Sequence, residues 1–327
     1  MKKFLGILTC LFALSIGHSQ QDYQLTQFQF DKVSLNPGAV GMEDNCLGLF
    51  YRNQWLNLSG EPKTFLLNYH MPVKQLKGGL GITFFQDELG NQRTSLGEVD
   101  SSFGPALTTT SFRLSYSFHK QLGSGTLGAG LSVGYQGQSV GNRWFAIDDP
   151  NADPAIPTAD VDNAGAADFN LGVYYKAANY WAGLSSTHLS APQLQGTTIN
   201  FDVARHYYFM AGMSKFAGNF EIKPSLLVKS DFISTSVDVN VIAEWNSLVW
   251  GGLGFRSQDA LNPMAGVNIS LPGSSSLTQS AKLGISYDVG LSELAKNSDG
   301  GIEIFLGYCW KFVPPVIRKS HGNPRWL

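Results

Sequence analysis

Residues 125–136 read Gly-Thr-Leu-Gly-Ala-Gly-Leu-Ser-Val-Gly-Tyr-Gln. Apolar residues occupy every second position, and only glycine and polar residues lie between them. Successive side chains of a β-strand point to opposite faces, so this stretch predicts a strand with one apolar and one polar face. In water the apolar face would pack on a core. In a membrane barrel it faces lipid, and the polar face lines the lumen.

The same alternation recurs along most of the chain. Residues 112–119, 237–246 and 302–311 repeat it, with aromatic residues often at the ends of the apolar stripes, where barrels place their interfacial girdles. We predict about fourteen such segments at the ~10-residue length that a tilted spanning strand needs. Their expected starts are near Cys46, Lys63, Lys77, Thr108, Gly125, Ala167, Asn179, Ala204, Gly218, Ser236, Leu248, Leu261, Ser280 and Ile302.

The lengths of the connections follow a parity rule. The four longest, residues 87–107, 139–166, 188–203 and 290–301, all follow odd-numbered segments, whereas those after even-numbered segments are short. Outer-membrane barrels have long extracellular loops and short periplasmic turns, and an even number of strands returns both termini to the periplasm. We therefore predict an all-β protein: a closed, transmembrane antiparallel β-barrel of about 14 strands in the outer membrane.

Composition agrees with this fold class and excludes others. Charged residues make up 15% of the 327 residues, hydrophobic residues 43%, and the mean hydropathy is −0.06. A helical membrane bundle needs several apolar runs of about 20 residues, and no run of that length is present. High charge with few aromatic residues is typical of disorder, and a strongly basic surface is typical of nucleic-acid binding; neither applies here, so no nucleic-acid partner is expected.

The N-terminus predicts export. Lys2 and Lys3 precede an apolar stretch over residues 4–16, and Gly17-His18-Ser19 supplies small residues for cleavage before Gln20. Cys10 lacks the small preceding residue of a lipoprotein signal. The expected divisions are a signal peptide at 1–19, a periplasmic N-terminal lead at 20–45, the barrel at 46–312 and a periplasmic C-terminal tail at 313–327. Cleavage removes two lysines, so the mature formal charge is −4.

An arginine of the first strand is expected inside the barrel. Arg52 shares a face with Gly48 and Phe50, and that face points into the lumen. A buried arginine needs a carboxylate partner or a water-filled cavity. Glu303, on the neighbouring last strand, or Glu244 could supply the carboxylate. Such an ion pair could hold a plugged barrel together, or the arginine could contact a substrate or an ion.

Two cysteines are expected to meet. Cys46 begins the first strand and Cys309 lies near the end of the last, and closing the barrel makes these strands antiparallel neighbours. Adjacent strands bring Cα atoms close enough for a disulfide, and the periplasm permits one. Two buried free thiols are the alternative.

No enzyme, metal site or cofactor is predicted. Residues 149–160 place acids like the opening of a calcium loop, but Pro154 stands where the sharp turn needs glycine, which favours a polar loop. The pair His188 and Ser190 could suggest a lipase, yet it lies in a predicted loop without a third partner. The histidines have no metal-ligand spacing, and no phosphate-binding glycine loop is present.

Motifs near the first hairpin carry a family resemblance. Asp31 to Gly41, with Asn36-Pro37-Gly38 and Gly41, is followed by Tyr51-Arg52-Asn53-Gln54-Trp55 and Glu61-Pro62-Lys63-Thr64. This resembles the PorP/SprF family of type IX secretion membrane proteins, with Gly38 in place of the usual alanine. The resemblance extends to Ser286-Tyr287-Asp288 and to Gly300-Gly301-Ile302-Glu303. It implies an outer-membrane component of the secretion and gliding apparatus that associates with periplasmic ring or peptidoglycan-linked components and, in some members, with a secreted adhesin.

The expected function is therefore to anchor or link that machinery, or a secreted adhesin, at the membrane. A general or solute-specific porin is the alternative. Bulky residues on the predicted inward face suggest an occluded interior, although an aromatic sugar slide would also use them: Phe50, Phe85, Tyr174, Tyr208, Met210, Trp250 and Phe305.

The tail carries the second expected site. It contains Arg318, Lys319 and Arg325 and no acids, and it ends Asn323-Pro324-Arg325-Trp326-Leu327. Arginine and tryptophan are common interface anchors, so these five residues are predicted to bind a periplasmic partner. A free end, or one folded back into the barrel, is the alternative.

Overall fold

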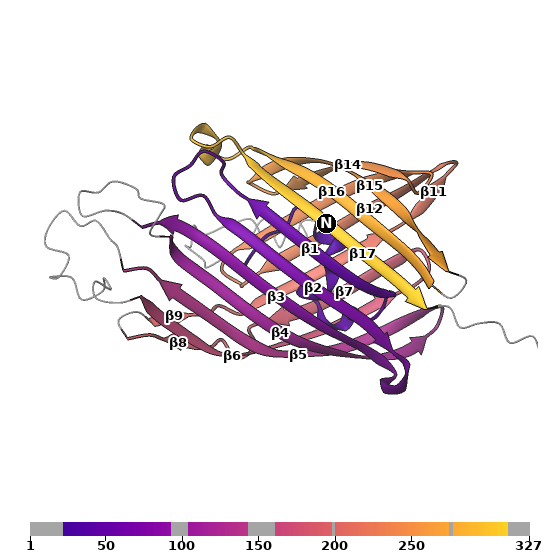
Figure 1. Cartoon of the computed structure of the whole chain (residues 1–327), viewed down its shortest axis with the longest axis horizontal. Helices are drawn as coiled ribbons and strands as arrows, with labels where there is room; N and C mark the ends of the chain where they lie inside the picture. Colours follow the sequence, from indigo (N-terminus) through magenta and orange to yellow (C-terminus); the bar gives the residue numbers. More distant parts are fainter. Residues whose placement is uncertain (1–21, 93–103, 143–160, 198–199, 275–276, 313–327) are drawn as a thin grey trace, which may run out of the picture.

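The computed structural model describes residues 22–92, 104–142, 161–197, 200–274 and 277–312. Fourteen antiparallel strands close into a barrel, as the sequence predicted. β17 lies beside β1 (Figure 1), and β10 pairs with β12. The barrel strands are β1 (Asn45–Asn53), β2 (Lys63–Val73), β3 (Gly78–Asn91), β4 (Pro105–Leu122), β5 (Gly125–Val140), β6 (Asp162–Lys176), β7 (Tyr180–Thr187), β10 (His206–Met213), β12 (Phe220–Ser230), β13 (Thr235–Trp245), β14 (Val249–Arg256), β15 (Ala260–Ser274), β16 (Leu277–Gly290) and β17 (Gly301–Phe312).

Three short strands lie outside the predicted set. β8 (Gln193–Gln195) and β9 (Asn200–Asp202) form a separate hairpin between β7 and β10, and β11 (Lys215–Ala217) extends the wall beside β12. A three-residue strand carries too few alternating positions for the sequence pattern to reveal it.

The strands bury their polar face and expose their apolar face. On β4, Phe112 and Leu114 are 44% and 47% exposed, whereas Arg113 and Ser117 are 5% and 0% exposed. A water-soluble sheet would show the reverse pattern. The outward apolar band is what a lipid-embedded barrel presents.

The barrel has two unlike ends. The connections after β1, β3, β5, β7 and β16 are long, and we call this the long-loop end. The connections after β2, β4, β6 and β13 are short, and we call this the short-turn end. β17 finishes at the short-turn end, beside the start of β1.

Residues 22–44, which we call the plug segment, fill the lumen. They form two 3-10 turns, η1 (Phe28–Phe30) and η2 (Pro37–Ala39), and one turn of helix, α2 (Lys32–Leu35). Their apolar side chains join inward-facing wall residues such as Tyr208 and Phe50 in buried clusters. The seven bulky residues predicted to face inward are all buried.

Residues 22–44 of the expected N-terminal lead at 20–45 thus lie inside the barrel, and the periplasmic location of the N-terminus stays a prediction. Asp22 lies inside the barrel toward the long-loop end, where Tyr208 and Lys229 contact it. The sequence pattern of the plug segment is too irregular to indicate a lumen position. Its buried location follows from contacts with the wall rather than from local periodicity.

Candidate functional site

The first site is a buried ion network where the barrel closes, which we call the seam latch: Thr26, Gln27, Arg52, Asp288 and Glu303. Arg52 of β1 donates to Glu303 of β17 at 3.2 Å and to Asp288 of β16 at 2.6 Å. Its side chain is 1% exposed, and that of Glu303 is fully buried. The structure thus brings Arg52 and Glu303 together, and Arg52 bridges two neighbouring strands.

The seam latch also holds the plug segment. The carboxylate of Glu303 accepts the backbone N–H groups of Thr26 at 2.6 Å and Gln27 at 2.8 Å. The Thr26 hydroxyl accepts from Arg52 and donates to Asp288 at 2.8 Å. Charge-assisted hydrogen bonds of this kind are about twice as strong as neutral ones. One carboxylate therefore joins the last strand to the plug segment.

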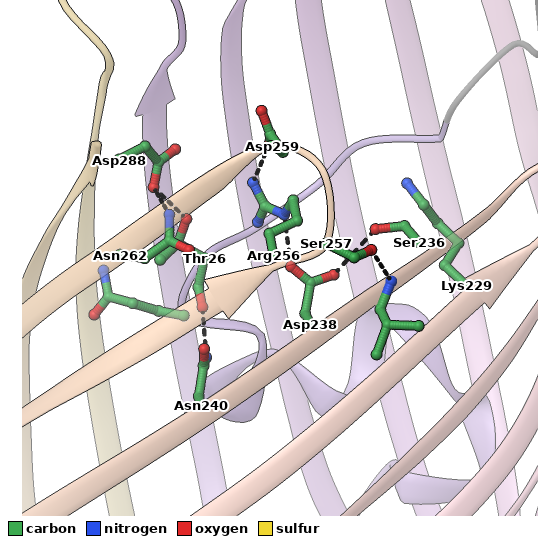
Figure 2. Close-up of polar contacts among 12 residues, drawn as sticks. Thr26, Lys229, Ser236, Asp238, Asn240, Arg256, Ser257, Asp259, Asn262 and Asp288 are labelled. Atoms are coloured by element: carbon green, nitrogen blue, oxygen red, sulfur yellow. Dashed lines mark hydrogen bonds and ion pairs between the residues drawn. The ribbon is translucent and has the colours of Figure 1, made fainter. Parts of the chain in front are cut away.

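A second ion group continues the network along the wall (Figure 2). Arg256, itself 1% exposed, donates to Asp238 at 2.5 Å and to Asp259 at 3.2 Å. Figure 2 also shows Asn240 reaching the carbonyl of Thr26, at 2.8 Å. Arg52 and Arg256 are thus each paired with carboxylates, as burial of charge requires.

Opposite the latch, small wall residues make room for the plug backbone. We call Gly128, Gly130, Gly172 and Gly183 the glycine lane. A Cβ on Gly130 would lie 2.2 Å from the carbonyl carbon of Pro37, and one on Gly172 would lie 2.1 Å from the Asn36 side-chain oxygen. Only glycine leaves the space that residues 36–38 occupy.

Asn36 fixes this turn. Its side-chain oxygen accepts the Gly38 N–H at 2.8 Å, and its side-chain nitrogen donates to the Val173 carbonyl at 3.0 Å and the Leu184 carbonyl at 3.3 Å. The Asn36-Pro37-Gly38 element therefore caps its own turn and ties the plug segment to β6 and β7. The sequence predicted the turn but not its wall contacts.

A third group surrounds the beginning of the plug segment. His188 Nδ1 lies 3.1 Å from Asp168, and its Nε2 lies 3.7 Å from Asp22. Tyr208 donates to Asp22 at 2.7 Å. Burial lowers the pKa of His188, but the neighbouring carboxylates of Asp168 and Asp22 outweigh burial and raise that pKa to about 9. His188 is thus a cation between a wall acid and a plug acid.

This group predicts a pH dependence. The His188 pKa is about 9 in the folded protein and about 6.5 when unfolded. Because the folded value is the higher one, the stabilisation is complete below pH 6.5 or so and is lost as the pH rises through about 9. We expect stability in detergent to fall by at most about 3 kcal/mol over this window. Urea unfolding at several pH values measures it. His188→Gln should flatten the curve, and an unchanged curve would contradict this prediction.

The two predicted cysteines meet at the seam. Cys46 and Cys309 stand directly opposite in the β1–β17 register and form a disulfide that links residues 263 positions apart. This bond joins the first and last strands at the short-turn end, beyond the seam latch.

We expect freshly isolated mature protein to carry this bond. Denatured without reductant, it should be two hydrogens lighter than the reduced chain, and neither cysteine should react with an alkylating agent. Intact-mass spectrometry before and after reduction measures both. The only other cysteine, Cys10, lies in the predicted signal peptide. Alkylation of Cys46 and Cys309 without reduction would rule the bond out.

The other predicted residues take separate positions. Glu244 does not reach Arg52; it pairs with Lys223 at 2.9 Å and Lys282 at 3.8 Å near the short-turn end. The calcium-like residues 149–160 and the C-terminal residues 323–327 lie outside the described part of the chain. Among the residues that the structure describes, no group of three or more His, Cys, Asp or Glu side chains is placed to hold a metal ion.

Sequence reasoning missed Asp288 and the plug contacts. Asp288 falls within the Ser286-Tyr287-Asp288 motif, but strand register alone pairs Arg52 with Glu303. The available signal was the run of glycines on inward positions of β5, β6 and β7, which indicates that another backbone approaches closely.

The closed wall, outward apolar band and filled lumen define an outer-membrane β-barrel. Residues 17–308 match the model of the family described as type IX secretion system membrane protein PorP/SprF, and the chain belongs to this family. Membership implies interaction with other secretion components, and the family is not a known enzyme class. None of the proteins with curated descriptions matches the chain.

Solved outer-membrane barrels resemble the fold. The Ralstonia pickettii toluene transporter TbuX is 12% identical, with a TM-score of 0.49, covering 85% of this chain and 92% of that one. A Pseudomonas aeruginosa FadL homologue is 11% identical, with a TM-score of 0.48 and coverages of 85% and 92%. The Pseudomonas putida toluene transporter TodX is 10% identical, with a TM-score of 0.47 and coverages of 89% and 95%.

Proposed function

We propose that this protein is a plugged outer-membrane anchor of the type IX secretion apparatus. It would hold periplasmic components, or a secreted surface adhesin, at the membrane without conducting solutes. The observation that carries the proposal is the seam latch, in which buried charges on β1, β16 and β17 bind the plug segment. Charge-assisted bonds are strong inside a low-dielectric lumen. A segment held by them is better suited to block the lumen permanently than to leave a path for diffusing solutes.

Gene deletion tests the role. We expect the deletion to abolish secretion or surface attachment of particular cargo while other outer-membrane proteins remain at normal levels. Complementation with the wild-type chain should restore it. Normal surface display of all secreted proteins in the deletion strain would overturn the proposal.

Conductance separates the anchor from the porin alternative. In planar bilayers, we expect the wild-type barrel to give no large, stable openings, because the plug segment packs against the wall from the seam latch to the glycine lane. A general porin of similar size provides the positive control. Large stable openings of the wild-type protein would favour the porin.

We also propose, from the sequence of the C-terminal tail, that its last five residues bind a periplasmic partner. Removing residues 323–327 should leave barrel assembly intact but reduce copurification of periplasmic components and block secretion. The tail follows β17, and β17 ends at the short-turn end. A periplasmic docking role for the tail therefore requires the short-turn end to face the periplasm. Full secretion by the truncated protein, at normal protein level, would exclude the docking role.

A further inference from the structure

The short-turn end contains a cavity of about 670 Å³, which we call the vestibule. Its apolar lining includes Phe30 of the plug segment, Trp181 of β7 and Phe305 of β17. The volume is within the range of pockets that bind small molecules or peptide side chains. The vestibule is therefore a hollow bounded by the wall and by the plug segment.

Four lysines line the vestibule: Lys32, Lys176, Lys223 and Lys282. Their side chains remain 21%, 36%, 33% and 28% exposed. Lys32 lies 4.9 Å from the centroid of the Trp181 ring, and Lys282 lies 4.7 Å from that of Phe30. Trp181 and Phe30 are thus each paired with a cation that still reaches solvent.

Three acids share the same rim. Glu43 contacts Lys32 at 3.2 Å and Lys176 at 3.3 Å, while Lys223 lies 2.9 Å from both Glu221 and Glu244. Each ammonium carries three donors. The four lysines therefore outnumber the acids and keep donors for an additional acceptor.

The positive charge extends beyond the vestibule. Exposed lysines ring the short-turn end on the turns and strand ends: Lys74, Lys77, Lys120, Lys215 and Lys311. One of them, Lys311, pairs with Asp44 at 3.1 Å. The described connections at the long-loop end are acidic instead, with Asp231, Asp259, Glu293 and Asp299 among their residues.

We propose that the short-turn end is a docking face for an acidic protein segment of a periplasmic partner. The vestibule lysines would receive its carboxylates, and an apolar side chain would rest on Phe30, Trp181 and Phe305. Complementary charge of this kind sets partner choice and speeds encounter. The inference rests on the proposed function, since it identifies where and by what chemistry a partner binds.

Two other occupants fit less well. The chain's own residues 313–327 carry three cations and no acid, so the vestibule lysines would repel them. Anionic phospholipid could neutralise the outer ring of lysines. It cannot account for the four vestibule lysines, because these line a cavity together with plug residues such as Phe30 and Met42.

Peptide binding tests the inference on the full mature chain in a neutral detergent. The probe is a fluorescent hexapeptide that alternates Glu with Leu and contains one Trp; its twin carries Lys in place of Glu. At low salt we expect the acidic peptide to bind at least about tenfold more tightly than its twin. The double variant Lys176→Gln/Lys282→Gln should reduce that affinity by about tenfold or more.

A matched control is Lys63→Gln/Lys296→Gln, which removes the same charge at the long-loop end and should leave binding unchanged. Equal binding of both peptides, or an equal loss in the control, would overturn the inference. A third arm measures retention on phosphatidylglycerol vesicles. If the vestibule variant binds the peptide normally and replacing the outer lysines abolishes only vesicle retention, the lysines serve the lipid surface and the inference fails. These binding measurements do not depend on secretion. A negative result would therefore overturn the docking inference without affecting the outcome of the gene-deletion experiment.

Discussion

Replacing Arg52 with methionine is expected to lower the free energy of unfolding by about 3–5 kcal/mol, the cost of leaving buried charges without a partner. Glu303 is fully buried and Asp288 nearly so, and each loses its arginine. Both carboxylates would still accept bonds from the plug segment, but both would lose their ion pair with Arg52. The change removes a side chain that contacts β16, β17 and the plug segment together.

Urea unfolding in detergent measures this loss, and heat-modifiable migration in gels provides a second readout. Lys63→Met on neighbouring β2 is the control; that side chain is 46% exposed, and its replacement should cost less than about 0.5 kcal/mol. Glu303→Gln should be milder than Arg52→Met, since the amide keeps an oxygen for Thr26 or Gln27. Equal stability of Arg52→Met and wild type would show that the seam latch does not stabilise the barrel.

Gly130→Val is expected to expel the plug segment from the glycine lane. A Cβ at this position would lie 2.2 Å from the Pro37 carbonyl carbon and 2.5 Å from the Gly38 nitrogen, both backbone atoms that cannot rotate away. Overpacking of this kind costs about 1–3 kcal/mol or more. We expect a barrel that still inserts into membranes but shows openings in planar bilayers that the wild type lacks.

The control for this change is Gly251→Val, on β14. A Cβ there meets only the Met264 carbonyl oxygen, at 3.8 Å, so the same enlargement should leave the lumen closed. Trypsin sensitivity at Lys32 gives an independent readout, because the displaced plug segment becomes accessible. A Gly130→Val barrel that stays closed and resists cleavage at Lys32 would show that the plug tolerates the enlargement.

The wall was predictable because it repeats one physical rule. Each spanning strand must turn apolar residues to lipid and polar or small residues inward, so fourteen segments carry the same period of two. Adjacency of the first and last strands then follows from closure, and it placed Arg52 near Glu303 and Cys46 near Cys309. These pairs required only strand register and parity.

The filling of the lumen was not predictable in this way. Residues 22–44 form single turns rather than a long element, so no period identifies what they contact. The contact between Arg52 and Asp288 was missed because the Arg52 side chain reaches diagonally past β17 to β16. The alternation of residues along a strand does not specify that direction. Asn36 reads as a turn residue, and its bonds to Val173 and Leu184 depend on where the turn is placed in three dimensions.

The position of Glu303 couples two steps of biogenesis. This residue lies on the last strand to be synthesised, yet it binds the amides of Thr26 and Gln27, some 277 positions earlier. Contacts so distant in sequence form late, after most of the chain is arranged. A barrel that closed around an empty lumen would lack two of the hydrogen bonds that satisfy the buried carboxylate of Glu303. Pairing of β17 with β1 and placement of the plug segment in the lumen therefore support each other. We therefore expect closure of the seam and seating of the plug segment to depend on each other during assembly.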